Sequence, residues 1–168
     1  MANEYYDAEK AHEYYEKHKK LKGRHSTKGF STRQKEMWMY GKAQLTNEKK
    51  VNKKSVTEDT RSQKSSVSEN AKSQKQALTN ECKEKIQLLR DKLKNMSPEA
   101  KKQFKETLTV MIADIRQKYA GQKSSVTEKA RSDKANLSES AKQKKGEIDK
   151  QYNDAVNKLY DNIKGGKR

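Results

Sequence analysis

The clearest pattern in the chain is an eleven-residue repeat of apolar positions that begins at Leu45. The first position of the repeat holds Val56, Val67, Leu78, Leu89, Phe104, Ile115, Val126, Leu137, Ile148 and Leu159. A second position, four residues later, holds Thr60, Ala71, Cys82, Leu93, Leu108, Tyr119, Ala130, Ala141, Tyr152 and Ile163. Eleven residues make three helical turns of 3.67 residues, so the pattern predicts long helices in a nearly straight or slightly right-handed coil.

The repeat is interrupted once, around residue 96. Ser97 is a good N-cap, and Pro98 suits the first position of a new helix. A capping box formed by Ser31 and Gln34 predicts the start of the first long helix. The sequence therefore predicts an all-α fold, an elongated antiparallel two-helix hairpin (an eleven-residue-repeat coiled coil) with a short N-terminal docking helix. We divide the chain into an N-terminal aromatic helix and basic linker (1–30), two long helices (31–95 and 96–164) and a tail (165–168).

The seam between the long helices is predicted to be uneven. Its register would place apolar residues opposite one another, pairing Leu89 with Phe104, Leu78 with Ile115, Val67 with Val126, Val56 with Leu137 and Leu45 with Ile148. Near the turn the seam reads as broad, with Ile86, Leu88, Leu89, Leu93, Phe104, Leu108, Val110, Met111 and Ile112. In the waist its third position reads as Gln63, Gln74, Gln122, Asp133 and Lys144. A waist that buries little apolar area is expected to be the least stable part.

The N-terminal segment reads as a short helix that Asp7 can cap and Gly23 can end. Its apolar stripe comprises Ala11, Tyr14, His18 and Leu21. A helix of about 16 residues is marginal in water, so we expect it to dock on a surface of either this chain or another chain. Residues 24–30 read as a linker.

Aromatic residues gather near the N-terminus and at the base of the hairpin. We predict that a partner docks on Tyr5, Tyr6, Tyr14, Tyr15, Leu21, Trp38 and Tyr40. Tryptophan and tyrosine are over-represented among the residues that anchor protein interfaces. A second interpretation has Trp38 and Tyr40 closing the base of the hairpin against Tyr152 and Tyr160.

Charge adds a second candidate surface. Lys and Arg number 40 against 23 Asp and Glu, which gives a net charge of +17. Between residues 17 and 35 the chain has no acidic residue and eight basic ones, namely Lys17, Lys19, Lys20, Lys22, Arg24, Lys28, Arg33 and Lys35. Such an arm suits the phosphates of a nucleic acid or an acidic groove on a protein. In the arms of the hairpin the two signs of charge are mixed, and a solvated face is the expectation there.

The sequence offers little for catalysis, metals or membranes. Cys82 is the single cysteine, and His12, His18 and His25 lack the four-residue spacing of a helical metal pair. A two-helix hairpin provides no concave apolar wall for a pocket, so we expect a non-enzyme without cofactors. We expect no signal peptide in the first ten residues, because they lack an apolar core after a basic start, and no stretch approaches the ~18 apolar residues of a membrane span.

The opening Tyr5-Tyr6-Asp7-Ala8-Glu9-Lys10-Ala11-His12-Glu13-Tyr14-Tyr15, with Leu21-Lys22-Gly23-Arg24 after it, resembles a group of phage proteins. These are small Lys-rich helical virion-associated proteins, encoded in the structural gene clusters of tailed phages and prophages of Gram-positive bacteria. The resemblance implies a virion component, made in the bacterial host cytoplasm, whose partners are other virion subunits such as a capsid or connector protein. A second copy of this chain, in a homo-oligomer, is a further candidate partner.

Three functions follow as expectations. The first is a virion structural protein, associated with the capsid or head, that acts by protein–protein docking. The second is a basic nucleic-acid-binding protein that is packaged with the genome. The third is a phage-encoded inhibitor of a host defence protein.

Overall fold

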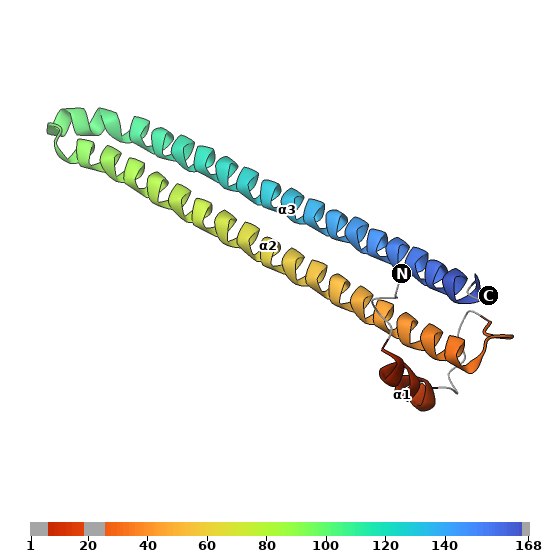
Figure 1. Ribbon diagram of the computed structural model, residues 1–168. Coiled ribbons are helices and arrows are strands. Elements are labelled where there is room, and N and C mark those ends of the chain that lie inside the picture. The colour runs from red at the N-terminus through yellow and green to blue at the C-terminus, as the bar shows by residue number, and fades with distance from the viewer. Residues whose placement is uncertain (1–6, 19–25, 166–168) are drawn as a thin grey trace. The chain divides into compact units, whose positions relative to one another are not determined.

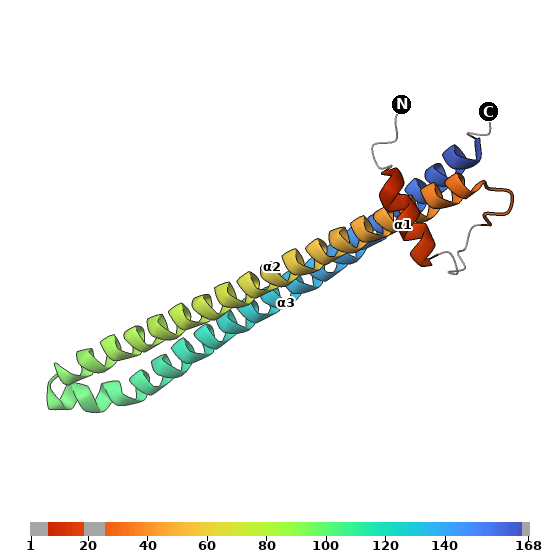
Figure 2. The ribbon, with the colours of Figure 1, turned by 60° about the horizontal axis from the view of Figure 1, so that its bottom comes forward.

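The protein is an all-α helical hairpin with a short helix before it, as the sequence predicts. The computed structural model describes residues 7–18 and 26–165. Helix α1 comprises Ala8–His18, α2 comprises Thr32–Lys94, and α3 comprises Pro98–Gly165. Helices α2 and α3 run antiparallel and pack against each other in both views (Figures 1 and 2).

The chain divides into two compact units. The base unit contains Met1–Glu58 and Ala141–Arg168, and the turn unit contains Asp59–Ser140. Each unit holds a segment of α2 and a segment of α3. The base unit also holds α1, and the turn unit holds the connection between the two long helices.

Local capping groups start each helix where the sequence predicts. The backbone N–H of Lys10 donates to the Asp7 carboxylate at 3.2 Å. In the capping box, the Gln34 N–H donates to Ser31 Oγ at 3.3 Å, and the Ser31 N–H donates to Gln34 Oε1 at 2.9 Å. These contacts satisfy backbone N–H groups that a helix start leaves without intrahelical partners.

The start of α3 and the approach to α2 are also fixed locally. Ser97 Oγ accepts from the Ala100 N–H at 3.4 Å, directly ahead of Pro98. Before α2, the Phe30 N–H donates to the Thr27 carbonyl at 3.1 Å, which closes a turn. Gly29 has φ = 84° within this turn, a conformation that costs glycine little. The turn directs Phe30 into the hydrophobic cluster of the base unit.

The eleven-residue seam is present, but its third position differs from the prediction. Of the five residues predicted there, Gln63, Gln74, Gln122 and Lys144 are exposed, and Asp133 is half-buried. The half-buried side chains lie one residue later, at Lys64, Lys75, Lys123, Lys134 and Lys145. Lysine can line a seam because its four methylenes lie along apolar neighbours while the ammonium group reaches water.

The seam near the turn is narrower than predicted. Ile86 and Leu108 are buried there, and Leu89, Leu93, Phe104 and Ile112 are half-buried. Leu88, Val110 and Met111 were expected in the seam, but their exposed fractions are 63%, 61% and 37%. Their spacing from the buried residues turns them away from the facing helix, because successive helical residues are separated by about 100°.

The side-chain pairs that touch across the hairpin also differ from the predicted pairs. The predicted register would place Thr46 opposite Glu147 and Trp38 opposite Ala155. Instead, the Thr46 and Tyr152 hydroxyls lie 3.2 Å apart, and Trp38 packs edge-on against Tyr160. Both partners lie five residues further along α3 than the predicted register has them. Helical side chains lean toward the N-terminus of their own helix by about one residue, which is less than this offset, so the two helices are shifted from the predicted register.

Candidate docking site at the base of the hairpin

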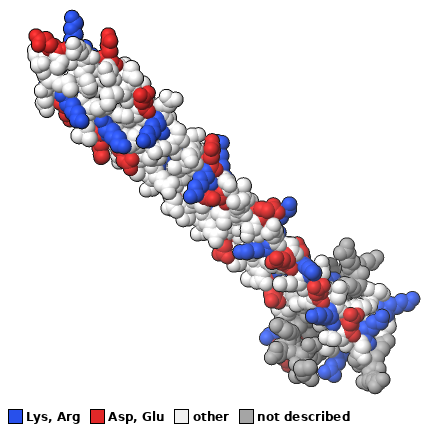
Figure 3. Space-filling model, turned by 90° about the horizontal axis from the view of Figure 1, so that it is seen from above, with Lys and Arg blue, Asp and Glu red and all other residues white. Residues whose placement is uncertain are grey.

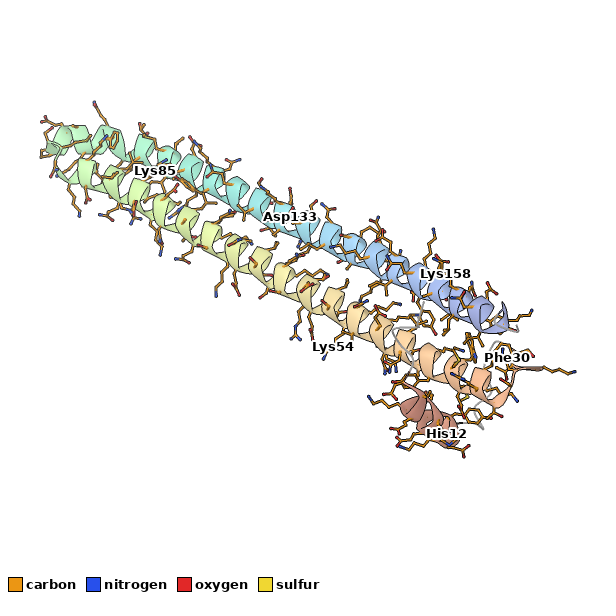
Figure 4. The ribbon with its side chains drawn as sticks, in the orientation of Figure 1. His12, Phe30, Lys54, Lys85, Asp133 and Lys158 are labelled. Carbon is orange, nitrogen blue, oxygen red and sulfur yellow. The ribbon has the colours of Figure 1, made fainter. Side chains whose placement is uncertain are left out.

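A cluster of aromatic and apolar side chains closes the base unit. Its buried members are Phe30, Trp38, Val156 and Ile163, and Met37, Met39, Leu45, Tyr152, Leu159 and Tyr160 pack around them. Phe30 stacks on Tyr160 with ring centroids 5.5 Å apart (Figure 4). The Tyr160 hydroxyl donates to the Ser26 carbonyl at 2.9 Å, which ties the segment before α2 to α3.

A polar contact joins the start of α2 to the end of α3. The Gln34 side-chain amide donates to the Ile163 carbonyl at 2.8 Å. The last carbonyls of a helix have no intrahelical donor, so this contact caps α3. One glutamine therefore serves the N-terminus of α2 through its Oε1 and the C-terminus of α3 through its Nε2.

Helix α1 is held on α2 by two described contacts. His12 Nδ1 lies 2.8 Å from a carboxylate oxygen of Glu36, and the Tyr14 ring meets the Tyr40 ring edge-on at 6.4 Å. Tyr14 also stacks on His18 with centroids 4.1 Å apart. The predicted docking of the short helix thus occurs within the chain itself, in the base unit.

An acidic group pairs with two lysines further along the base unit. The Asp149 carboxylate lies 2.8 Å from Lys49 Nζ and 2.6 Å from Lys53 Nζ. Hydrogen bonds from these two ammonium groups hold the pKa of Asp149 below its ordinary value. Lys49 also lies over the Tyr152 ring, 4.3 Å from its centroid.

The predicted docking residues fall into three groups. Tyr5, Tyr6 and Leu21 lie outside the described residues. Trp38 is only 3% exposed, and it closes the base together with Tyr160, as the second interpretation had it. Tyr14 and Tyr40 contact each other, whereas half-buried Tyr15 makes no ring contact or hydrogen bond among the described residues.

The predicted basic arm is described only in part. Lys19, Lys20, Lys22 and Arg24 lie outside the described residues. Lys17, Lys28 and Arg33 are exposed, and Lys35 is half-buried in the first turns of α2. The described part of the arm therefore presents charge on both sides of the turn at Gly29.

The structure brings out a repeated lysine and hydroxyl pair that the sequence analysis missed. In each such pair the Ser or Thr hydroxyl donates to the carbonyl of the lysine four residues earlier. Around the first seam position the pairs are Thr46 with Lys42, Thr57 with Lys53, Ser68 with Lys64, Thr79 with Lys75, Thr127 with Lys123 and Ser138 with Lys134. Thr109 and Lys105 form the same pair around the second seam position, Leu108. The sequence signal of the first six pairs is a lysine three residues before the first seam position and a hydroxyl directly after that position.

Two other classes of site receive no support within residues 7–18 and 26–165. In that part of the chain, no three His, Cys, Asp or Glu side chains are grouped so that they could hold a metal ion. Cys82 is a free, half-buried thiol at the second seam position. Among the described helices, none is long and apolar enough to cross a membrane.

Comparison with protein-family models, curated proteins and solved structures finds no match to this chain.

Proposed function

We propose that the protein is a structural component of a phage virion, associated with the capsid or head, that acts by docking on other subunits and not by catalysis. The virion assignment is supported by the resemblance of the opening residues to virion-associated proteins. The docking assignment is supported by the base unit, where α1 is attached to α2 through His12–Glu36 and Tyr14–Tyr40.

The attachment of α1 is the observation that carries the proposal. A single short helix held by a few contacts adds little to the stability of a long hairpin, but it enlarges the surface of the base. Five consecutive residues of α1 bear three charged groups and two tyrosines, Glu13, Tyr14, Tyr15, Glu16 and Lys17. Of these side chains, the tyrosines are the type enriched among the residues that anchor protein interfaces.

The direct test is quantitative mass spectrometry of purified particles from a host that produces the full-length protein. We expect the protein in a fixed stoichiometric ratio to the major capsid protein. Its absence from purified particles would overturn the proposal. Recovery on one host protein instead would favour the inhibitor function.

A pair of full-length variants locates the docking surface. Tyr15→Ser removes a base-unit aromatic without a described contact, and Leu88→Ser removes an apolar side chain of the turn unit that is 63% exposed. We expect Tyr15→Ser to lower incorporation several-fold and Leu88→Ser to leave it unchanged. Circular dichroism checks that both variants keep their helices. The reverse result would move the docking surface to the turn unit.

A further inference from the structure

The charges of the turn unit are sorted by side, although they look mixed along the sequence. One edge of the seam is lined by the half-buried lysines, and we call it the lysine edge. Within residues 61–83 and 116–138, three of the eleven repeat positions lie at or beside this edge: the lysine position, the hydroxyl position four residues later, and the position four residues after that. They hold Arg61, Lys64, Ser68, Lys72, Lys75, Thr79 and Lys83 on α2, and Arg116, Ala120, Lys123, Thr127, Arg131, Lys134 and Ser138 on α3. We call this set the basic face. It has nine basic residues, four hydroxyl residues, one alanine and no acidic residue.

Both rows of the basic face lie on one side of the hairpin. When each helix is viewed from its own N-terminus, the row is reached from the seam by turning in the same direction around the helix axis. Two antiparallel helices are related by a two-fold axis perpendicular to the plane that contains them, and this axis keeps each side of the plane on the same side. The two rows therefore share one side of the hairpin. The base unit shows the same geometry, because Lys53 and Asp149 meet across the seam at 2.6 Å. Lys53 lies three residues before a first seam position, Asp149 lies directly after one, and both of these repeat positions belong to the basic face in the turn unit.

The acidic residues of these segments lie elsewhere. Glu69, Glu81, Glu128 and Asp133 all fall outside the three positions of the basic face. The Tyr119 hydroxyl donates to Glu81 at 3.3 Å, and Asp133 stands one residue before the half-buried Lys134, at a repeat position that does not belong to the basic face. The side of the protein seen in Figure 3 carries both signs of charge interspersed.

The ammonium and guanidinium groups of the basic face are available to a ligand. None of the nine takes part in an ion pair among the described residues. Lys64, Lys75, Lys123 and Lys134 are half-buried, and the five others are exposed. Seam packing fixes the stems of the half-buried lysines, so their charges are held in position with less loss of side-chain freedom on binding.

We propose that the basic face binds the phosphate backbone of duplex nucleic acid without sequence preference; this inference does not depend on the virion role. Lysine is depleted and aromatic residues are enriched in protein–protein interfaces, and the basic face has no aromatic residue. Membrane-surface helices insert apolar side chains, which this face lacks. Single-strand binding relies on aromatic stacking, which is also missing here. Phosphate contacts need only positive charge at regular intervals, and equivalent residues recur about every 16.5 Å along each helix.

Two double variants of the full-length protein form a matched test. Lys123→Gln with Lys134→Gln removes two charges from the basic face. Lys118→Gln with Lys129→Gln removes two charges from another side of the same helix, with the same eleven-residue spacing. Both variants have the same net charge, and both leave the basic arm at residues 17–35 intact. Fluorescence anisotropy with a labelled 30-base-pair DNA of arbitrary sequence, measured over a range of salt concentrations, reports affinity and its salt dependence.

We expect the basic-face variant to bind about tenfold more weakly at 0.1 M salt, with a slope of log affinity against log salt that is shallower by about two. The control variant should match the wild type. A Lys123→Arg with Lys134→Arg variant should bind like the wild type, which separates loss of charge from loss of fold. Equal weakening by the two glutamine variants would overturn the proposal, because binding would then follow net charge alone. Preference for vesicles containing phosphatidylserine, for poly-glutamate or for single-stranded DNA would overturn it too.

Discussion

Three glycines lie well inside the long helices, and their surroundings predict different responses to alanine. A β-carbon added at Gly121 or Gly146 in α3 would meet no atom within 4 Å outside its own helix turn. A β-carbon added at Gly41 in α2 would lie 2.9 Å from one methyl group of Leu159 and 3.4 Å from the other. Alanine is favoured over glycine inside a helix by about 0.8–1.0 kcal/mol. We therefore expect Gly121→Ala and Gly146→Ala each to raise the free energy of unfolding by about that amount.

At Gly41 the same gain is opposed by a contact that is too short. Leu159 must shift or leave its preferred rotamer, which costs about 0.5–1.5 kcal/mol. Gly41→Ala should therefore change stability by less than about 0.5 kcal/mol in either direction, and it should fall about 1 kcal/mol below the two α3 variants. Urea denaturation followed by circular dichroism at 222 nm measures all three.

A double-mutant cycle tests the cause of that difference. In the Leu159→Ala background the obstructing methyl groups are gone, so Gly41→Ala should recover its full helix gain. Gly121→Ala should give the same increment in both backgrounds. The reasoning fails if Gly41→Ala stabilises the wild type as much as Gly121→Ala does, or if removing Leu159 leaves its effect unchanged.

Three further predictions concern buried groups, a cap and pH. Leu108→Ala should cost about 2–3 kcal/mol because this side chain is 8% exposed, whereas Val110→Ala, at 61% exposed, should stay within about 0.5 kcal/mol; equal costs would contradict the observed seam. Gln34→Ala should lower the free energy of unfolding by about 1–2 kcal/mol, because it removes a cap from both long helices. Gln76→Ala, at an exposed position, should be near neutral, and thermal unfolding measures both variants. The pKa of Asp149 is lowered in the folded state from its ordinary value of 3.8, so the ionised carboxylate stabilises the fold at pH values above 3.8. The stability advantage of the wild type over Asp149→Asn should be full above about pH 5 and should vanish as the pH falls below 3.8. An advantage that persists at low pH would exclude the ion pairs as its source.

The starts of the helices were predictable because their signals are local, whereas the predicted helix end at Gly23 lies outside the described residues. Ser31 with Gln34, and Ser97 with Pro98, act on backbone groups within one turn of themselves, and their contacts are those the sequence indicates. The contacts that hold the base together were not predictable. His12–Glu36 joins residues 24 positions apart, and Gln34–Ile163 joins residues 129 positions apart, and no local pattern selects such partners.

The errors in the seam have a common physical origin. The predicted third seam position lies one residue too early, at Gln63 and Gln74, whereas the stems of Lys64 and Lys75 line the seam. Near the turn the prediction assigns every apolar residue to the interior, although Leu88 and Val110 point away from it. Angular position around the helix decides burial here, and residue type decides only how well each position packs.

The eleven-residue repeat also explains how a chain with mixed charges can present one basic face. A repeat of three whole turns returns each position to the same direction, so a row of equivalent residues stays on one side along the helix. A single repeat on α2 includes Arg61, Lys64 and Glu69, and a count along the sequence finds both signs together. Arg61 and Lys64 belong to rows at the lysine edge of the seam, and Glu69 belongs to a row directed away from it. The period that makes the hairpin pack is therefore also the device that separates its charges.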